Sequence, residues 1–168
     1  SGLGTINDND LPALSVSSPT VGEGGFAVFT VALSNLSTTA VTFNPTLASG
    51  TATVGTDTGS VLEYFNGTAW VAVPVGGVTI AAGRTSVQVR VATTDDAAAE
   101  GSETFALTAT VTAGTTSNAS ASGTATITDD ADVTTVTLTA TPSVVEGGSI
   151  TYTATLTNAA VTPLTVTL

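Results

Sequence analysis

The sequence predicts an all-β protein built as an antiparallel β-sandwich, and three observations support this. Apolar residues alternate with polar or small ones over short stretches, as at Phe29, Val31 and Leu33, and a period of two is typical of strands. Threonine and valine fill many of the other positions, and their branched β-carbons suit a pleated sheet. Clusters of Gly, Asn and Pro interrupt these stretches, and no segment shows a helical stripe.

Nine strands are expected in the central part of the chain. The alternating stretches define most of them, and Asn66-Gly67 adds a hairpin because this dipeptide readily takes positive φ at both central positions of a tight turn. Trp70, on the second arm of that hairpin, is expected to cover an open end of the core rather than to stack on a ligand. In order, the expected strands are 13–18, 25–34, 40–48, 60–65, 68–73, 77–81, 85–93, 104–112 and 121–128.

The chain contains an internal repeat. Residues 4–33 resemble residues 125–156: Ile6 aligns with Ile127, and Glu23-Gly24-Gly25 aligns with Glu146-Gly147-Gly148. The offsets of 121 (127−6) and 123 (146−23) indicate a repeat of about 120 residues. The predicted organisation is the end of a preceding repeat or linker at 1–10, a complete sandwich at 11–132, and the N-terminal part of a following repeat at 133–168.

Composition excludes several classes of function. With 2 Lys and Arg against 13 Asp and Glu, the formal net charge is −11, so nothing can neutralise the phosphates of a nucleic acid. The chain has no Cys, Met or His, which removes thiolate nucleophiles, imidazole bases and the usual zinc ligands. No apolar run approaches the roughly 20 residues that cross a bilayer. An enzyme is not expected, because paired carboxylates such as Glu100 and Glu103 lack the cleft and aromatic platforms of a glycosidase.

The carboxylates fall in connections between strands rather than within them. Glu63 is the exception, and it is expected to face solvent. In an antiparallel sandwich every second connection lies at the same end, so the first, third and seventh loops and the chain exit should converge. These segments contain Glu23, Asp57, Asp95, Asp96, Glu100, Glu103, Asp129, Asp130 and Asp132.

Such a cluster needs a counter-charge. Two unit charges 4 Å apart repel by about 4 kcal/mol at an effective dielectric of 20, and the two cations, Arg84 and Arg90, are expected elsewhere. An external cation with oxygen ligands is therefore predicted, and flexible loops with many carboxylates suit the six to eight ligands of Ca²⁺ better than octahedral Mg²⁺. A merely solvated acidic rim is the alternative.

Six stretches of the central module, in order, resemble the Calx-beta domain family, which occurs in tandem in large bacterial surface proteins including RTX-type adhesins. They are Val21–Gly25, Gly50–Asp57, Val78–Gly83, Thr94–Asp96, Glu100–Phe105 and Gly123–Asp130. The resemblance implies an immunoglobulin-like sandwich with a multi-calcium cluster at its C-terminal end. By position, it implies that the ligands are Glu23, Asp57, Asp95, Asp96, Glu100, Asp129 and Asp130, with a backbone carbonyl near Ala98. Glu103 is a further ligand or a loop-holding residue, and Asp132, which follows Ala131, is a further candidate.

The function expected from these features is that of a calcium-stiffened extender in a long, secreted or surface-anchored bacterial adhesin of the kind that builds biofilms. Calcium at the C-terminal end would rigidify the joint to the adjacent repeat of the same chain. A host or surface ligand would be bound through other domains. The alternative is a module that binds carbohydrate or ice itself, through loops or through Thr-rich runs such as 134–139.

Overall fold

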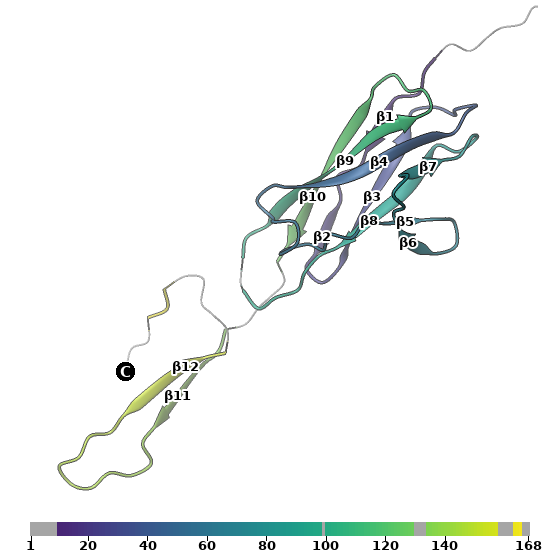
Figure 1. Cartoon of the computed structure of the whole chain (residues 1–168). Coiled ribbons are helices and arrows are strands. Elements are labelled where there is room, and N and C mark those ends of the chain that lie inside the picture. Colours follow the sequence, from purple (N-terminus) through teal and green to yellow (C-terminus); the bar gives the residue numbers. More distant parts are fainter. Residues whose placement is uncertain (1–9, 99, 130–133, 158–162, 166–168) are drawn as a thin grey trace, which may run out of the picture.

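The computed structural model describes residues 10–98, 100–129, 134–157 and 163–165, and all regular structure in them is β (Figure 1). In the described part of the chain, no helix has the length and apolar character that crossing a bilayer requires. In chain order the strands are β1 (Leu14–Val16), β2 (Thr20–Gly22), β3 (Phe26–Leu33), β4 (Val41–Ser49), β5 (Glu63–Phe65), β6 (Trp70–Ala72), β7 (Val78–Ile80), β8 (Ser86–Ala92), β9 (Glu103–Ala113), β10 (Ser120–Thr128), β11 (Val136–Ala140) and β12 (Tyr152–Leu156).

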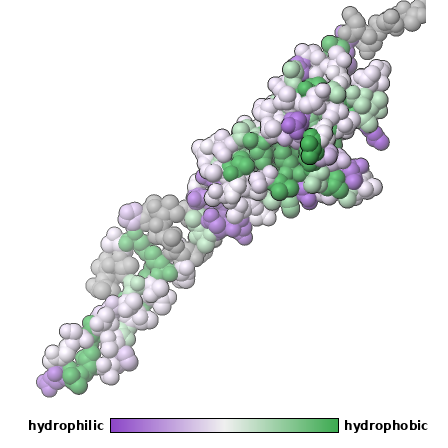
Figure 2. All heavy atoms as spheres, viewed as in Figure 1, coloured by the Kyte–Doolittle hydropathy of each residue, from purple (hydrophilic) through white to green (hydrophobic). Residues whose placement is uncertain are grey.

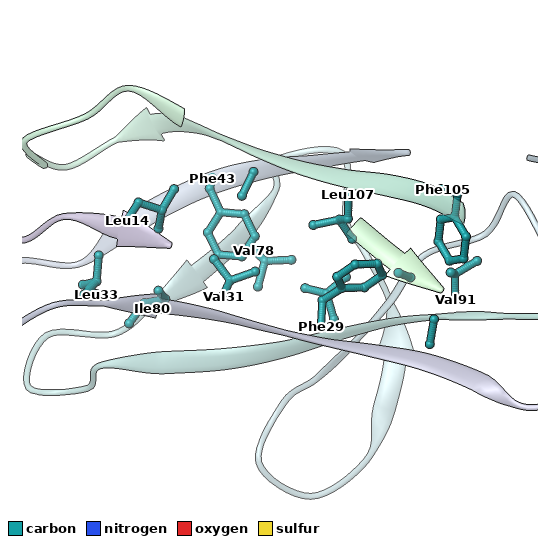
Figure 3. Packing of buried hydrophobic residues seen from close by; sticks show 14 of the residues in the cluster. Leu14, Phe29, Val31, Leu33, Phe43, Val78, Ile80, Val91, Phe105 and Leu107 are labelled. Carbon is teal, nitrogen blue, oxygen red and sulfur yellow. The ribbon is translucent and has the colours of Figure 1, made fainter. Parts of the chain in front are cut away.

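Two five-stranded sheets form the sandwich, in the orders β1-β3-β8-β5-β6 and β2-β10-β9-β4-β7. Side chains two residues apart point between the sheets: on β3, Ala27, Phe29, Val31 and Leu33 are buried and the residues between them are half-buried. The rings of Phe29 and Phe105 meet edge to face in this core, with centroids 5.9 Å apart (Figure 3). The predicted all-β sandwich is confirmed, and the period of two in the sequence is its physical basis.

The N-terminal segment changes from one sheet to the other. One strand was predicted over 13–18, but β1 ends at Val16 and Pro19 precedes a separate strand, β2. β1 pairs antiparallel with β3, whereas β2 pairs parallel with β10. The described strand ladders are therefore antiparallel as predicted, except for this pair, which is parallel. A strand of three residues carries no alternation that a sequence pattern can reveal.

The hairpin at Asn66-Gly67 forms between β5 and β6, but not through a two-residue turn. The closing pair Phe65↔Trp70 leaves residues 66–69 in the loop, and among the described residues only glycines, including Gly67 with a φ of 102°, have positive φ. Asn66 contributes through its side chain, because Oδ1 accepts hydrogen bonds from the backbone N–H groups two and three residues later, at 3.0 and 2.9 Å. An Asx-type turn thus replaces the expected tight turn.

One prediction for a side chain on this sheet is wrong, and another is incomplete. Trp70 does not cover an end of the core. It lies half-buried on the outer face, with its ring 5.5 Å from that of Phe65 and 4.3 Å from the guanidinium carbon of Arg90. Glu63 does not simply face solvent, because it is half-buried and forms an ion pair with Arg90 at 2.8 Å. β5 pairs with β8, which is distant in sequence, so these partners could not be found from local pattern.

Residues 134–157 form the antiparallel hairpin β11–β12. Val136 pairs with Leu156 and Leu138 pairs with Ala154. The β1–β3 ladder is also antiparallel, and there Leu14 pairs with Leu33. Every residue of both strands is exposed, and Figure 2 shows apolar side chains at the surface of this hairpin. The hairpin thus has the strand pairing of the first antiparallel pair of the sandwich.

Candidate functional site

The parallel pair β2–β10 brings the first and last of the predicted carboxylates together. Gly22 pairs with Thr128 in this ladder, and the N–H of Glu23 donates to the carbonyl of Thr128 at 3.2 Å. Glu23 and Asp129 each follow directly after the end of a paired strand. Residues separated by about 100 positions therefore lie side by side at one end of the sandwich, where Figure 1 shows the turn after β2 beside the end of β10.

A second loop, between β4 and β5, places Asp57 at the same end. Asp57 Oδ2 accepts a hydrogen bond from the N–H of Thr53 at 2.6 Å, which fixes the carboxylate over its own loop. The carbonyl of Asp57 accepts from the N–H of Thr94 at 2.9 Å, and Thr58 forms a bridge with Thr93. These bonds tie the loop to the segment that carries Asp95 and Asp96.

Thr93 fastens that segment to the turn at Glu23. Its hydroxyl accepts from the N–H of Gly25 and donates to the carbonyl of Gly22, each at 3.0 Å. Gly24 lies so close that a β-carbon there would be 3.2 Å from the β-carbon of Asp95. The turn at Glu23 and the start of the β8–β9 connection are therefore one packed unit.

The remaining predicted residues come from the β8–β9 connection and the start of β9. Asp96 Oδ1 accepts a hydrogen bond from the N–H of Ala98 at 2.7 Å, and Ala98 is half-buried. Glu100 is exposed, whereas Glu103 is half-buried and pairs with Ile127 in the β9–β10 ladder. Asp130 and Asp132 lie outside the described residues, so their predicted roles stay predictions.

Burial and repulsion raise the pKa of Glu23 above its ordinary value. Burial is the largest cause, followed by the negative charges of Asp129, Asp96 and Glu100, while a hydrogen bond to the backbone at Asp96 acts in the opposite direction. Glu23 Oε2 and Asp129 Oδ1 are buried and have no hydrogen-bond partner among the described residues. Buried carboxylate oxygens without a hydrogen-bond partner are costly, so these two oxygens are unfavourable for the folded state.

The pKa of Glu103 is also raised above its ordinary value. Its pKa is raised first by burial, then by the charges of Asp57 and Glu100, by a hydrogen bond with Asp57, and by the charge of Asp96. No positive side chain among the described residues forms an ion pair here, since the one salt bridge in the described part of the chain joins Arg90 to Glu63. The chain therefore provides no counter-charge for this end from the residues described.

The carboxylate and carbonyl oxygens gathered at this end are of the kind that a hard cation prefers, although the side chains do not converge on a single point. Among the described residues, no group of three or more Asp or Glu side chains has an arrangement that could hold a metal ion. The chemistry of the set is nevertheless uniform, because only carboxylate and carbonyl oxygens are present and the chain has no His or Cys. The structure thus gathers Glu23, Asp57, Asp95 and Asp129 at one end without forming a coordination shell.

Sequence reasoning missed the residues that hold this end together. Thr53 and Thr93 donate or accept the hydrogen bonds that join the loops, and Thr93 is buried. A threonine just after a strand is too common in this chain to be singled out, and only the pairing between distant loops reveals its role.

The comparisons with known proteins concern different parts of the chain. Residues 132–168 match the LapA domain family. No curated protein matches the chain. Among solved structures, the chain is similar to the calcium binding domain CBD12 of CALX1.1, with a TM-score of 0.52 and 20% identity over 70% of this chain and 44% of that one. It is also similar to the apo-form Calx CBD1 domain, with a TM-score of 0.50 and 19% identity over 71% of this chain and 99% of that one.

The fold is Calx-beta-like. At 19–20% identity the likeness establishes the fold alone, and the chain spans less than half of the CBD12 structure. Within this Calx-beta-like sandwich, the gathered carboxylates occupy the end at which the chain leaves β10 for the segment that matches LapA.

Proposed function

We propose that the sandwich is a calcium-stiffened extender module of a bacterial surface adhesin. The observation that carries the proposal is the pair of buried, unpartnered carboxylate oxygens of Glu23 and Asp129, which stand where the chain exits toward the next unit. A cation bound there would join the last residues of the sandwich to loops from its interior. The joint to the following repeat would then lose freedom when the ion binds.

Calcium is the ion that this donor set favours. All candidate ligands are oxygens, they come from four separate segments, and Ca²⁺ accepts six to eight such ligands in flexible geometry. The residues that would hold it are Glu23, Asp57, Asp95, Asp96, Glu100, Asp129 and Asp130, with the carbonyl near Ala98 and with Glu103 and Asp132 as further ligands. The ion would supply charge compensation, and the chain would supply the preformed loop contacts.

The adhesin context rests on the match of residues 132–168 to the LapA domain, a surface adhesin family. Location outside the cell fits the chemistry, because extracellular modules bind calcium at about 10⁻⁴ to 10⁻³ M. The partners would be the adjacent repeats of the same chain, and the role would be mechanical rather than catalytic. Stiffening would accompany export to a medium that contains calcium.

Calorimetric titration of calcium into the chelator-treated chain, with thermal unfolding in calcium and in chelator, tests this proposal. Calcium should bind with release of heat or protons and should raise the Tm by several degrees, since a ligand at 100 times its Kd stabilises by about 2.7 kcal/mol. Magnesium at the same concentration is the control and should have a smaller effect, because it demands octahedral geometry. Equal unfolding curves in calcium and in chelator would overturn the proposal.

A further inference from the structure

The outer face of the β1-β3-β8-β5-β6 sheet carries an aromatic cluster that the proposed function does not use. The guanidinium of Arg90 lies between two rings, 3.9 Å from the centroid of Phe26 and 4.3 Å from that of Trp70. The Phe65 ring packs against Trp70 at 5.5 Å. Phe26 is 46% exposed and Phe65 is 36% exposed. In a chain with only 5% aromatic residues, such a group at the surface is unusual.

The ion pair inside this cluster leaves one carboxylate oxygen and one guanidinium NH₂ group without partners. Glu63 Oε2 accepts a hydrogen bond from Nε of Arg90 at 2.8 Å, and Nη2 of Arg90 lies 2.8 Å from the same oxygen in the ion pair. Glu63 Oε1 and Arg90 Nη1 form no hydrogen bond with any described residue. Both side chains reach the surface, with 33% and 20% of their area exposed. A carboxylate acceptor and a guanidinium donor thus stand side by side with no net charge between them.

A hollow of about 510 Å³ lies next to this pair. Its lining combines an exposed ring with the ion pair and with small groups that leave space, namely Phe26, Gly59, Ser60, Val61, Glu63, Arg90 and Ala92. None of these residues belongs to the carboxylate set at the end of the sandwich. From this arrangement we infer that the hollow is a binding site for a neutral saccharide.

The chemistry of the hollow matches a sugar ring better than other ligands. The C–H face of a pyranose packs on an exposed aromatic ring, while neighbouring hydroxyls donate to a carboxylate oxygen and accept from a planar N–H group. An anion would be repelled by Glu63, and a cation would meet Arg90, so a paired site selects an uncharged polar ligand. A neutral saccharide satisfies both free groups at once and leaves neither charge uncompensated.

Nuclear magnetic resonance titration of the ¹⁵N-labelled full chain tests this inference. The probes are three neutral oligosaccharides, cellohexaose, mannotriose and lactose, with trigalacturonic acid as an acidic comparison. At least one neutral probe should shift the amides of residues 59–63 and 90–92 at millimolar concentration, and trigalacturonic acid should bind at least tenfold more weakly. Calcium should not be required, so this result is independent of the extender proposal, which the calcium titration tests.

Variants separate the site from a general surface effect. Phe26→Ala should weaken binding at least tenfold, whereas Phe26→Tyr, which keeps the ring, should retain it. Glu63→Gln should also weaken binding. Leu36→Ala changes an exposed apolar residue outside the hollow and should have no effect. The inference is overturned if no neutral probe shifts these amides, if the shifts lie elsewhere, or if Phe26→Ala binds as well as the parent chain while remaining folded.

Discussion

At the scale of single residues, the carboxylates at the end of the sandwich are the least compensated groups of the described structure. Glu23 Oε2 and Asp129 Oδ1 are buried without partners, and burial and repulsion together raise the pKa of Glu23 and of Glu103. Carboxylates with perturbed pKa values of this kind cluster at functional sites, which makes Glu23 and Glu103 the first residues to test.

Neutralising one of these carboxylates should therefore have opposite effects without and with calcium. In chelator, Glu23→Gln removes a repelled charge and should raise the Tm by about 2–4 °C. In calcium, the same change removes a proposed ligand and should weaken binding at least tenfold. Thermal unfolding and calorimetric titration measure the two effects. Glu146→Gln, an exposed carboxylate on the β11–β12 hairpin, is the matched control and should change neither, and a loss of Tm in chelator for Glu23→Gln would contradict the charge-repulsion account.

The raised pKa values also set a pH dependence. A carboxyl whose pKa is higher in the folded state than in the unfolded state holds its proton more tightly when folded, so stability falls as pH rises through that range and is regained as pH falls. In chelator, the free energy of unfolding should therefore increase on lowering the pH from 7 toward the region just above 4.5, the ordinary value for Glu. Urea unfolding at a series of pH values measures this. A steady loss of stability over the same range would show that other groups dominate.

At the scale of elements, the β5–β6 hairpin is joined to the sheet by few backbone pairs. β5 pairs with β8 at only two positions, Glu63↔Arg90 and Tyr64↔Val89. The side chain of Arg90 adds an ion pair to Glu63 and contacts with Phe26 and Trp70. This one side chain therefore braces the hairpin against the sheet.

Removing that brace should loosen the hairpin. Two cation–π contacts at about 0.5–1 kcal/mol each, together with the lost hydrogen bond and ion pair to Glu63, predict that Arg90→Met destabilises the chain by about 2 kcal/mol. Hydrogen exchange should accelerate most over 63–72. Arg84→Met is the matched control because Arg84 is exposed, and it should change stability by less than about 0.5 kcal/mol. Equal effects of the two changes would contradict the bracing role.

A glycine on β10 allows the N-terminal segment to cross between sheets. A β-carbon at Gly123 would meet the carbonyl of Ser17 and would lie 2.9 Å from Val16 Cγ1. Gly123→Ala should therefore destabilise the sandwich by about 1–3 kcal/mol through overpacking. Gly76→Ala, where nothing lies within 4 Å of the added carbon, should be close to neutral. Urea unfolding of both variants measures these changes in the free energy of unfolding. An unchanged free energy for Gly123→Ala would show that the N-terminal segment shifts to accommodate the added methyl group.

These elements also show what sequence could and could not predict. The alternation around Phe29 and Phe105 specified buried strands because the pleat of a strand imposes that period. Strand direction predicted that the loop of Asp57 and the chain exit at Asp129 lie at one end, whereas the place of Glu23 beside Asp129 depends on the parallel pair β2–β10. The parallel strand β2 and the Arg90 cluster could not be found in this way, since each depends on contacts between segments that are far apart in the chain. Whether the carboxylates bind metal is a matter of side-chain geometry, which no spacing encodes.

At the scale of the whole molecule, the same chain joins a sandwich to a segment that matches LapA, through the carboxylate end. A module that acts by length needs joints that resist bending, and a joint made of like charges resists it poorly. Repulsion among carboxylates favours many open arrangements, whereas a divalent ion favours the few in which their oxygens converge. Stiffness would then depend on the ion rather than on a large apolar interface.

Distance measurement between the two parts of the chain tests this directly. The chain has no cysteine, so Thr110→Cys and Thr153→Cys, both at exposed strand positions, would be its only thiols and could carry paired spin labels. In chelator the distance distribution should be broad, and in calcium it should narrow, because the ion would tie the exit after β10 to the loops of Glu23 and Asp57. Asp129→Asn on the same labelled chain should keep the distribution broad in calcium, while Glu146→Gln should not. Narrow distributions in both conditions would mean that the joint is rigid without the ion.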